Sequence, residues 1–328
     1  MKKILMLTTG GTISSIKSNE GLVPSNLNHV LNYVGVIKDF ELISKELMVL
    51  DSSNIQPEEW KTIAKAIYDQ INNYDGIVVT HGTDTMAYTT SMVSFMIQNP
   101  TIPVVFTGSQ LPIDNELSDA ITNLRLAFKM ALSGCPGIFL AFDRQIILGS
   151  RAVKVRATSF HAFESINTYP IATLDSKGLS IHKSALPKFS KKTIFNPNIN
   201  SNVFLLKLTP ATDPKIISLL INANYKGIVI EAFGQGGLQF VRRDFAPYLI
   251  EAKEKNVAIV VASQCLYDGA NLETYQVGKK ALETGVIQSS DMTCEAAVTK
   301  LMWILGQTND LNKVKEMFNK NLSGEIKA

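Results

Sequence analysis

The sequence has 328 residues, of which 45% are hydrophobic and 19% are charged, as expected of a globular protein with a sizeable core. Its 32 basic and 29 acidic residues leave a net charge of +3, which is too small to predict binding to nucleic acid or to a membrane surface. At roughly 150 residues per domain, this length predicts two domains.

Cysteine usage and hydropathy predict a cytoplasmic protein. The three cysteines form no CxxC pair and leave an odd count, which argues against a disulfide scaffold. No apolar run reaches the about 18 residues that a membrane span requires. The run Ile4–Leu7 follows two lysines but ends at Thr8, too early for a signal peptide, so we expect a first strand there. We expect neither a membrane nor a nucleic acid as a partner.

The N-terminal half alternates apolar runs with amphipathic segments. After the first strand, three short apolar runs predict buried parallel strands: Gly76–Val79, Pro103–Thr107 and Gly137–Phe142. Apolar residues at three- and four-residue spacing predict helices that begin at Pro57, Met86 and Ser118. This alternation is typical of βαβ units around a parallel sheet.

The second half repeats this pattern after a polar, proline-containing stretch. The composition of residues 187–202 predicts a linker between an N-terminal catalytic domain, 1–186, and a C-terminal α/β domain, 203–328. Strands are expected at Val203–Leu208, Gly227–Phe233 and Val257–Ser263. Helices are expected at Pro214–Ala223, Phe245–Lys255, Val277–Glu283, Cys294–Leu305 and Leu311–Asn319. The predicted fold class is α/β, with a larger, mostly parallel N-terminal domain and a smaller C-terminal domain.

The segment Thr80–Thr85, with the sequence Thr-His-Gly-Thr-Asp-Thr, is the first candidate site. It directly follows an expected strand, and the active sites of open α/β sheets lie beyond the strand ends. A polar turn with helix-capping residues would have the same composition. Both interpretations stay open at this point.

Threonine, lysine and aspartate together form a complete set for acyl transfer. The hydroxyl of Thr12 or Thr83 is a weak nucleophile until a base takes its proton, and a desolvated Lys154 can serve as that base; Asp84 neighbours Thr83 in the sequence. Main-chain N–H groups of the Gly10-Gly11 pair can face an oxyanion. A solvated strand face explains Lys154 as well.

Metal and serine-hydrolase chemistry are not indicated. Of the four histidines only His81 lies in a motif, and neither HExxH nor a paired-histidine spacing is present. The sequence also lacks G-x-S-x-G. We therefore expect no metal and no other cofactor.

Two motifs, Thr9-Gly10-Gly11-Thr12-Ile13 and His81-Gly82-Thr83-Asp84-Thr85, carry a family resemblance. Together they resemble the bacterial-type L-asparaginase family. Further segments follow in the family's order: Leu50–Ser53, Pro57–Trp60, Thr107–Pro112, Ala152–Lys154 and Ser263–Cys265. The resemblance covers nearly the whole chain, and without a secretion signal the sequence is similar to the cytoplasmic type I branch.

The resemblance implies a reaction. Thr12 would attack the side-chain amide carbon of L-asparagine, release ammonia and form a β-aspartyl enzyme that water then hydrolyses. Thr83, Lys154 and Asp84 would form a supporting triad, with Lys154 accepting a proton through Thr83. Which threonine attacks first is a mechanistic assignment that no sequence settles.

The resemblance also implies the substrate contacts. Ser52 and Ser53 would hydrogen-bond the α-carboxylate, while Asp84 would pair with the ammonium. The main-chain N–H groups of Gly11 and Thr83 would form the oxyanion hole.

One position departs from the family pattern. Many members carry a tyrosine in the loop after the first motif, and the matching residue here is Leu22, which has no hydroxyl. A leucine can still close a lid and exclude water. We therefore expect Leu22→Tyr not to abolish turnover.

Three alternatives stay open. The chain resembles the D subunit of the archaeal tRNA-dependent amidotransferase, but that protein carries an extra N-terminal domain for which we expect no room before Thr9. Glutaminase activity is a second alternative, because one methylene changes specificity by only ~1–3 kcal/mol. A non-enzymatic amino-acid sensor is the third, and it would be expected to lack Thr12, Thr83 or Lys154. The family further implies a homodimer or a homotetramer.

Overall fold

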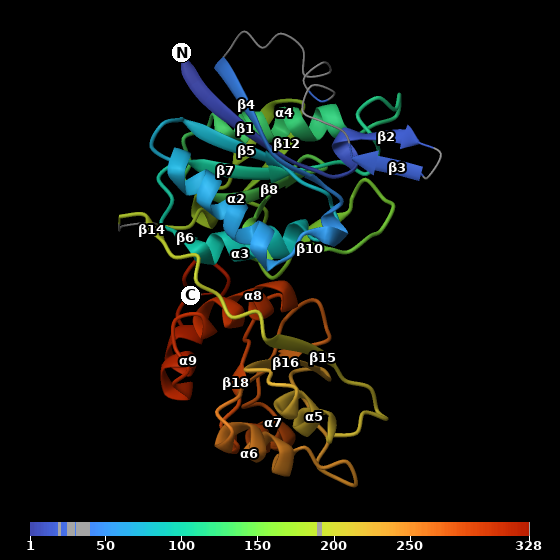
Figure 1. The fold of residues 1–328 in the computed structure, drawn as a ribbon, viewed down its shortest axis with the longest axis vertical. Coiled ribbons are helices and arrows are strands. Elements are labelled where there is room, and N and C mark those ends of the chain that lie inside the picture. The colour runs from blue at the N-terminus through green and yellow to red at the C-terminus, as the bar shows by residue number, and fades with distance from the viewer. Residues whose placement is uncertain (19–20, 25–29, 31–39, 189–191, 328) are drawn as a thin grey trace. The chain divides into compact units, whose positions relative to one another are not determined.

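The structure is a computed structural model that describes residues 1–18, 21–24, 30, 40–188 and 192–327. The chain divides into two compact units, Met1–Pro197 and Asn198–Ala328 (Figure 1). The predicted linker, 187–202, contains this division. The two-domain α/β architecture is confirmed. Among the described residues, no helix has the length and apolar character needed to cross a membrane.

The first unit is built on a mixed, mostly parallel sheet. Its eight described strands run in the order β13-β12-β9-β8-β7-β5-β1-β4. The parallel strands are β1 (Lys2–Gly10), β4 (Phe40–Leu50), β5 (Gly76–Thr80), β7 (Pro103–Thr107) and β8 (Gly137–Phe142). All residues of β5, β7 and β8 are buried, which explains why they are continuous apolar runs.

The predicted helices of this unit are confirmed, and they lie on both faces of the sheet. They are α2 (Pro57–Gln70), α3 (Met86–Met96) and α4 (Ala120–Ala131). Helix α2 begins at a proline, and Gln56 and Glu59 form a capping box there. Helix α4 shares one hydrophobic core with alternate residues of the central strands, while α2 and α3 lie across the sheet from it (Figure 1).

The antiparallel edge of this sheet was not predicted. It consists of β9 (Gln145–Leu148), β12 (Ala172–Asp175) and β13 (Gly178–Ile181). Strands β8 and β9 form a hairpin through Asp143 and Arg144, whose φ angles are 42° and 63°. Such a turn is usually marked by Asn-Gly or Asp-Gly, so the sequence Asp-Arg gives no hairpin signal.

Three short strand pairs complete the first unit. They are β2 (Ser15–Ser18) with β3 (Gly21–Pro24), β10 (Ala152–Lys154) with β11 (Phe163–Ser165), and β6 (Ile97–Gln98) with β14 (Ile194–Phe195). Strand β14 lies inside the predicted linker, so part of that segment pairs with the first unit.

The second unit has a smaller sheet of four described strands, all parallel. They are β15 (Val203–Lys207), β16 (Gly227–Ala232), β17 (Ala258–Ser263) and β18 (Ile287–Gln288). The helices are α5 (Ile216–Asn222), α6 (Ala246–Glu254), α7 (Gln276–Glu283), α8 (Cys294–Leu305) and α9 (Leu311–Phe318). The predicted elements of this half are present, with ends shifted by one or two residues at most.

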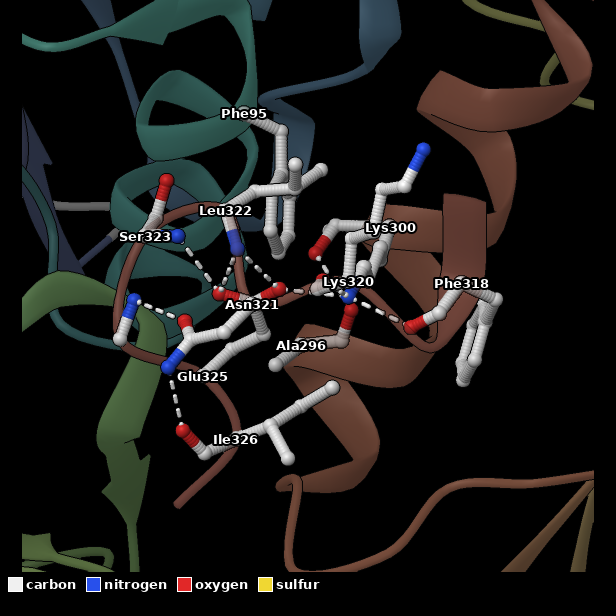
Figure 2. A network of polar contacts seen from close by, with 12 residues as sticks. Phe95, Ala296, Lys300, Phe318, Lys320, Asn321, Leu322, Ser323, Glu325 and Ile326 are labelled. Carbon is white, nitrogen blue, oxygen red and sulfur yellow. Dashed lines mark hydrogen bonds and ion pairs between the residues drawn. The ribbon is translucent and has the colours of Figure 1, made fainter. Parts of the chain in front are cut away.

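A buried lysine of α8 holds the C-terminal segment of this unit. Lys300 Nζ donates hydrogen bonds to the carbonyl oxygens of Phe318 and Lys320, and to Glu325 Oε1 at 2.5 Å (Figure 2). The Glu325 carboxylate also accepts hydrogen bonds from the main-chain N–H groups of Leu322 and Ser323. Both charged side chains are fully buried.

Candidate active site

The loops after four parallel strands meet at the carboxyl edge of the first sheet. Gly11 follows β1, Ser52 follows β4, Gly82 follows β5 and Gly108 follows β7. Because the carboxyl ends of parallel strands share one edge, segments far apart in the sequence are brought together there.

Glycines allow these loops to approach closely. Gly11 has φ 83°, and a Cβ at this position would lie 2.4 Å from the main-chain nitrogen of Gly82. A Cβ at Gly82 would lie 2.5 Å from Ser52 Oγ, and one at Gly108 would lie 2.3 Å from the carbonyl oxygen of His81. The two threonine motifs are therefore in direct main-chain contact, and Thr12 begins the short 3-10 helix η1 (Thr12–Ser14) at this contact.

Lys154 lies against the second motif. It is the last residue of β10, and its Nζ donates to Thr83 Oγ1 at 2.8 Å and to Asp84 Oδ1 at 2.6 Å. The Lys154 side chain is only 17% exposed, so the interpretation of Lys154 as a solvated strand residue is wrong. Asp84 is 63% exposed, which leaves its second oxygen accessible to a cationic ligand.

Gln110 belongs to this site, although no sequence pattern assigned it a role. Its Oε1 accepts a hydrogen bond from Thr83 Oγ1 at 3.3 Å. Its Nε2 donates to the carbonyl oxygens of Ala157 and Ser159, and its main-chain N–H donates to Asp119. The sequence Thr-Gly-Ser-Gln after a predicted strand marked the segment but not which of its side chains reaches Thr83.

His81 is structural rather than catalytic. It is fully buried, and burial lowers its pKa to about 4, so the ring is neutral at physiological pH. Nδ1 donates to the carbonyl oxygen of Gly82, which only accepts, so Nε2 is the nitrogen that accepts from Thr89 Oγ1 at 3.0 Å. Thr89 in turn accepts from Trp60 Nε1, which ties the loop to α2 and α3.

Of the two serines predicted to bind the substrate carboxylate, Ser52 is the better placed. Its buried Oγ accepts a hydrogen bond from the Asp84 N–H, which leaves its own proton to donate. Ser53 is exposed, and both its Oγ and its N–H donate to Asp51 Oδ1. These bonds lower the pKa of Asp51 and commit the Ser53 proton to that carboxylate.

The N–H of Gly11, predicted as an oxyanion donor, has a main-chain partner in this structure. Its N–H donates to the carbonyl oxygen of Leu50 at 3.0 Å, because this residue continues the pairing of β1 with β4. The missing side chain of Gly11 allows the close approach of Gly82, and its role as an oxyanion donor stays a prediction. The N–H of Thr83 is the second predicted donor.

Strand β3 of the hairpin β2–β3 contacts η1, the short helix that begins at Thr12. Leu22, the residue at the position of the family's tyrosine, is on β3 and pairs with Lys17 on β2. Its side chain lies outside the described part of the structure, so the lid role stays a prediction. Among the described residues, no group of three or more His, Cys, Asp or Glu side chains is arranged to hold a metal ion.

Comparison with known families matches both halves of the chain. Residues 3–187 match the family described as Asparaginase, N-terminal, and residues 202–318 match the Glutaminase/Asparaginase C-terminal domain. The chain is 43% identical to an L-asparaginase of Thermococcus kodakarensis over 99% of both proteins. It is also 34% identical to the D subunit of the glutamyl-tRNA(Gln) amidotransferase of Methanosphaera stadtmanae, over 99% of this chain and 77% of that protein.

Solved structures agree with the sequence matches. The thermostable L-asparaginase from Thermococcus kodakarensis superposes with a TM-score of 0.94 at 41% identity, covering 99% of both chains. L-asparaginase I from Vibrio cholerae superposes with a TM-score of 0.89 at 29% identity, covering 100% of this chain and 99% of that one. With both of its halves matched and these similarities spanning its whole length, the chain belongs to the asparaginase family.

Proposed function

We propose that this protein is an L-asparaginase that hydrolyses L-asparagine to L-aspartate and ammonia through a threonine nucleophile and an acyl-enzyme. The observation that carries the proposal is the contact of Lys154 Nζ with both Thr83 Oγ1 and Asp84 Oδ1. This arrangement supplies the base that a threonine hydroxyl needs before it can attack an amide.

In the proposed reaction Thr12 attacks the side-chain amide carbon of the substrate. Its proton moves to Thr83 Oγ1 while the proton of Thr83 moves to Lys154, which accepts it in the amine form. The ammonia leaves with a proton returned along the same path, and water then hydrolyses the β-aspartyl ester. Asp84, at 2.6 Å from Nζ, holds Lys154 in place throughout.

The α-amino acid part of the substrate has candidate partners of the right charge. The exposed oxygen of Asp84 would accept from the ammonium, and Ser52 Oγ would donate to the α-carboxylate. Ser53 Oγ would donate to the α-carboxylate only after breaking its hydrogen bond to Asp51 Oδ1. The Thr83 N–H is the proposed oxyanion donor.

The finer assignments form part of the same proposal. We place the protein in the cytoplasmic type I branch, as a homodimer or homotetramer, with catalytic groups in residues 1–186, a linker at 187–202 and a second domain at 203–328. Similarity to L-asparaginase I from Vibrio cholerae over the whole chain supports the branch. The chain is 43% identical to the Thermococcus L-asparaginase but only 32–36% identical to the amidotransferase D subunits, which favours the asparaginase assignment.

Ammonia release from L-asparagine and L-glutamine, assayed in parallel for the wild-type protein and Thr12→Ala, tests the function. We expect asparagine turnover in the wild type and a loss of about a thousandfold or more in Thr12→Ala, because the nucleophile is removed. Comparable turnover of both amides would make the protein a glutaminase-asparaginase. Binding of asparagine without ammonia release would instead indicate an amino-acid sensor.

A further inference from the structure

Gln110 connects the Thr83 hydroxyl to the loop that follows Lys154. Its Nε2 donates to the carbonyl oxygens of Ala157 and Ser159, each at 3.0 Å, and its Oε1 lies 3.3 Å from Thr83 Oγ1. The Gln110 side chain therefore contacts Thr83, the hydrogen-bond partner of Lys154, with its oxygen. With its nitrogen it contacts the loop that follows Lys154.

The two carbonyl partners determine the orientation of the Gln110 amide. A carbonyl oxygen only accepts hydrogen bonds, so the NH2 group must face Ala157 and Ser159, and Oε1 must face Thr83. Oε1 also only accepts, so the Thr83 hydroxyl must donate its single proton to Gln110.

Both lone pairs of Thr83 Oγ1 then face away from Gln110. One accepts a hydrogen bond from Lys154 Nζ at 2.8 Å. Among the hydrogen bonds of the described residues, none occupies the other. A hydroxyl oxygen has two acceptor sites, so one site is left for a proton that arrives from an attacking hydroxyl.

We propose that Gln110 is a positioning residue of the hydrolytic reaction, which directs the Thr83 proton away from Lys154 in the resting enzyme. This inference rests on the proposed function. When the nucleophile gives its proton to Thr83 Oγ1, the Thr83 proton leaves Gln110 for the Lys154 amine, so one proton in total passes from nucleophile to lysine. The distance of 3.3 Å between Thr83 Oγ1 and Gln110 Oε1 is long for an O–H···O hydrogen bond. Breaking this bond when the Thr83 hydroxyl rotates toward Lys154 therefore costs little free energy.

Gln110 and Lys154 compete for the same proton. While Thr83 donates to Gln110, its oxygen accepts from Lys154 Nζ, and Lys154 in its amine form can take the Thr83 proton only after that proton turns away from Gln110. An acceptor at position 110 therefore keeps the second acceptor site of Thr83 Oγ1 open for the proton of the nucleophile until the transfer begins. Asp84 accepts from Lys154, and Asp119 accepts from the Gln110 main chain. Arg156 and His161, which follow Lys154 in the chain, pair with Glu164 and Asp143.

The test compares Gln110→Met, which keeps the length but removes the acceptor, with Gln110→Glu, which replaces it by a carboxylate. Gln98→Met is the matched control, because Gln98 also donates its amide to a main-chain carbonyl of this unit but lies on β6. Ammonia release from L-asparagine is measured between about pH 5 and 9, so that kcat, KM and the acid limb of the profile are obtained together.

We expect Gln110→Met to lower kcat about tenfold with KM changed less than about twofold, because no acceptor then holds the Thr83 hydroxyl with its second acceptor site open to the nucleophile. Gln110→Glu should move the acid limb upward by about one pH unit, because an ionised carboxylate is a stronger acceptor for the Thr83 proton. If Gln110→Met does not fold, the direction of the Gln110→Glu shift decides. Unchanged profiles, or the same change in Gln98→Met, would overturn the positioning role. A wild-type protein that releases no ammonia would overturn the proposed function, and this inference with it.

Discussion

Gly11 sets how closely the two threonine motifs approach. It combines a positive φ of 83° with a Cβ position only 2.4 Å from the main-chain nitrogen of Gly82. Gly134 has a similar φ of 73°, but nothing lies within 4 Å of its Cβ position. Alanine substitutions at the two glycines therefore distinguish two effects on the free energy of unfolding. Gly134→Ala measures the effect of a side chain at positive φ, and Gly11→Ala adds the steric clash with Gly82.

We expect Gly134→Ala to lower the free energy of unfolding by about 1 kcal/mol, the cost of a side chain at positive φ. Gly11→Ala should cost about 1–3 kcal/mol more, because main chain would have to move aside, and should abolish ammonia release by displacing Thr12. Urea unfolding and activity of both variants provide the test. Equal losses of stability with activity retained in Gly11→Ala would show that the close contact is not required.

At the same scale, the sequence indicated the residue types of the site better than their contacts. Motif spacing and resemblance identified Thr83, Asp84 and Lys154, and the structure brings these three together. The Ser53 bond to Asp51 and the orientation of Gln110 depend on which of several polar neighbours lies within about 3 Å, and no sequence pattern specifies that.

Among the elements, those buried on a continuous face were predictable. Helix α2 and strand β7 have periodic or uniform apolar patterns because packing requires them. Strands β12 and β13 are short and only partly buried, so their sequences carry no such pattern. The register of an edge strand is set by its neighbour, which a linear pattern does not reveal.

The buried ion pair between Lys300 and Glu325 holds the C-terminal segment after α9 against α8. With Glu325 neutralised in Glu325→Gln, the fully buried Lys300 ammonium loses its counter-charge (Figure 2). We expect a loss of about 3–5 kcal/mol in the free energy of unfolding, because an unpaired buried charge is costly. The surface pair Lys320–Glu316 is the control, since both side chains are more than half exposed and Glu316→Gln should leave the free energy of unfolding almost unchanged.

The single variant Lys300→Met and the double variant Lys300→Met with Glu325→Gln complete the cycle. Removing both charges should recover part of the loss, because no charge is then left buried without a partner. Additive losses in urea unfolding would mean that the main-chain hydrogen bonds of Lys300 to Phe318 and Lys320, rather than the ion pair, hold the segment.

For the whole molecule, the two units contain buried groups whose titration acts in opposite directions. In the first unit burial lowers the pKa of His81 from 6.5 to about 4, so the unfolded chain binds a proton that the folded one excludes. In the second unit burial, together with the charge of Glu231, raises the pKa of Glu295 from 4.5 to about 7, so the folded chain keeps a proton that the unfolded one loses.

The sign of each effect follows. The first unit should lose up to about 3 kcal/mol of stability as the pH falls from 6.5 to 4, and the second should lose up to about 3 kcal/mol as the pH rises from 4.5 to 7.

The chain has two tryptophans, Trp60 on α2 and Trp303 on α8, so each unit has its own fluorescent reporter. Urea unfolding of Trp303→Phe and of Trp60→Phe at about pH 5 and 7.5 would follow the units separately. The first unit, reported by Trp60, should unfold at a lower urea concentration at about pH 5 than at about pH 7.5. The second unit, reported by Trp303, should show the opposite dependence. Adding His81→Gln or Glu295→Gln should flatten only the dependence of its own unit, since each removes one titrating group. A common pH dependence for both reporters would show that the units unfold together or that other groups dominate.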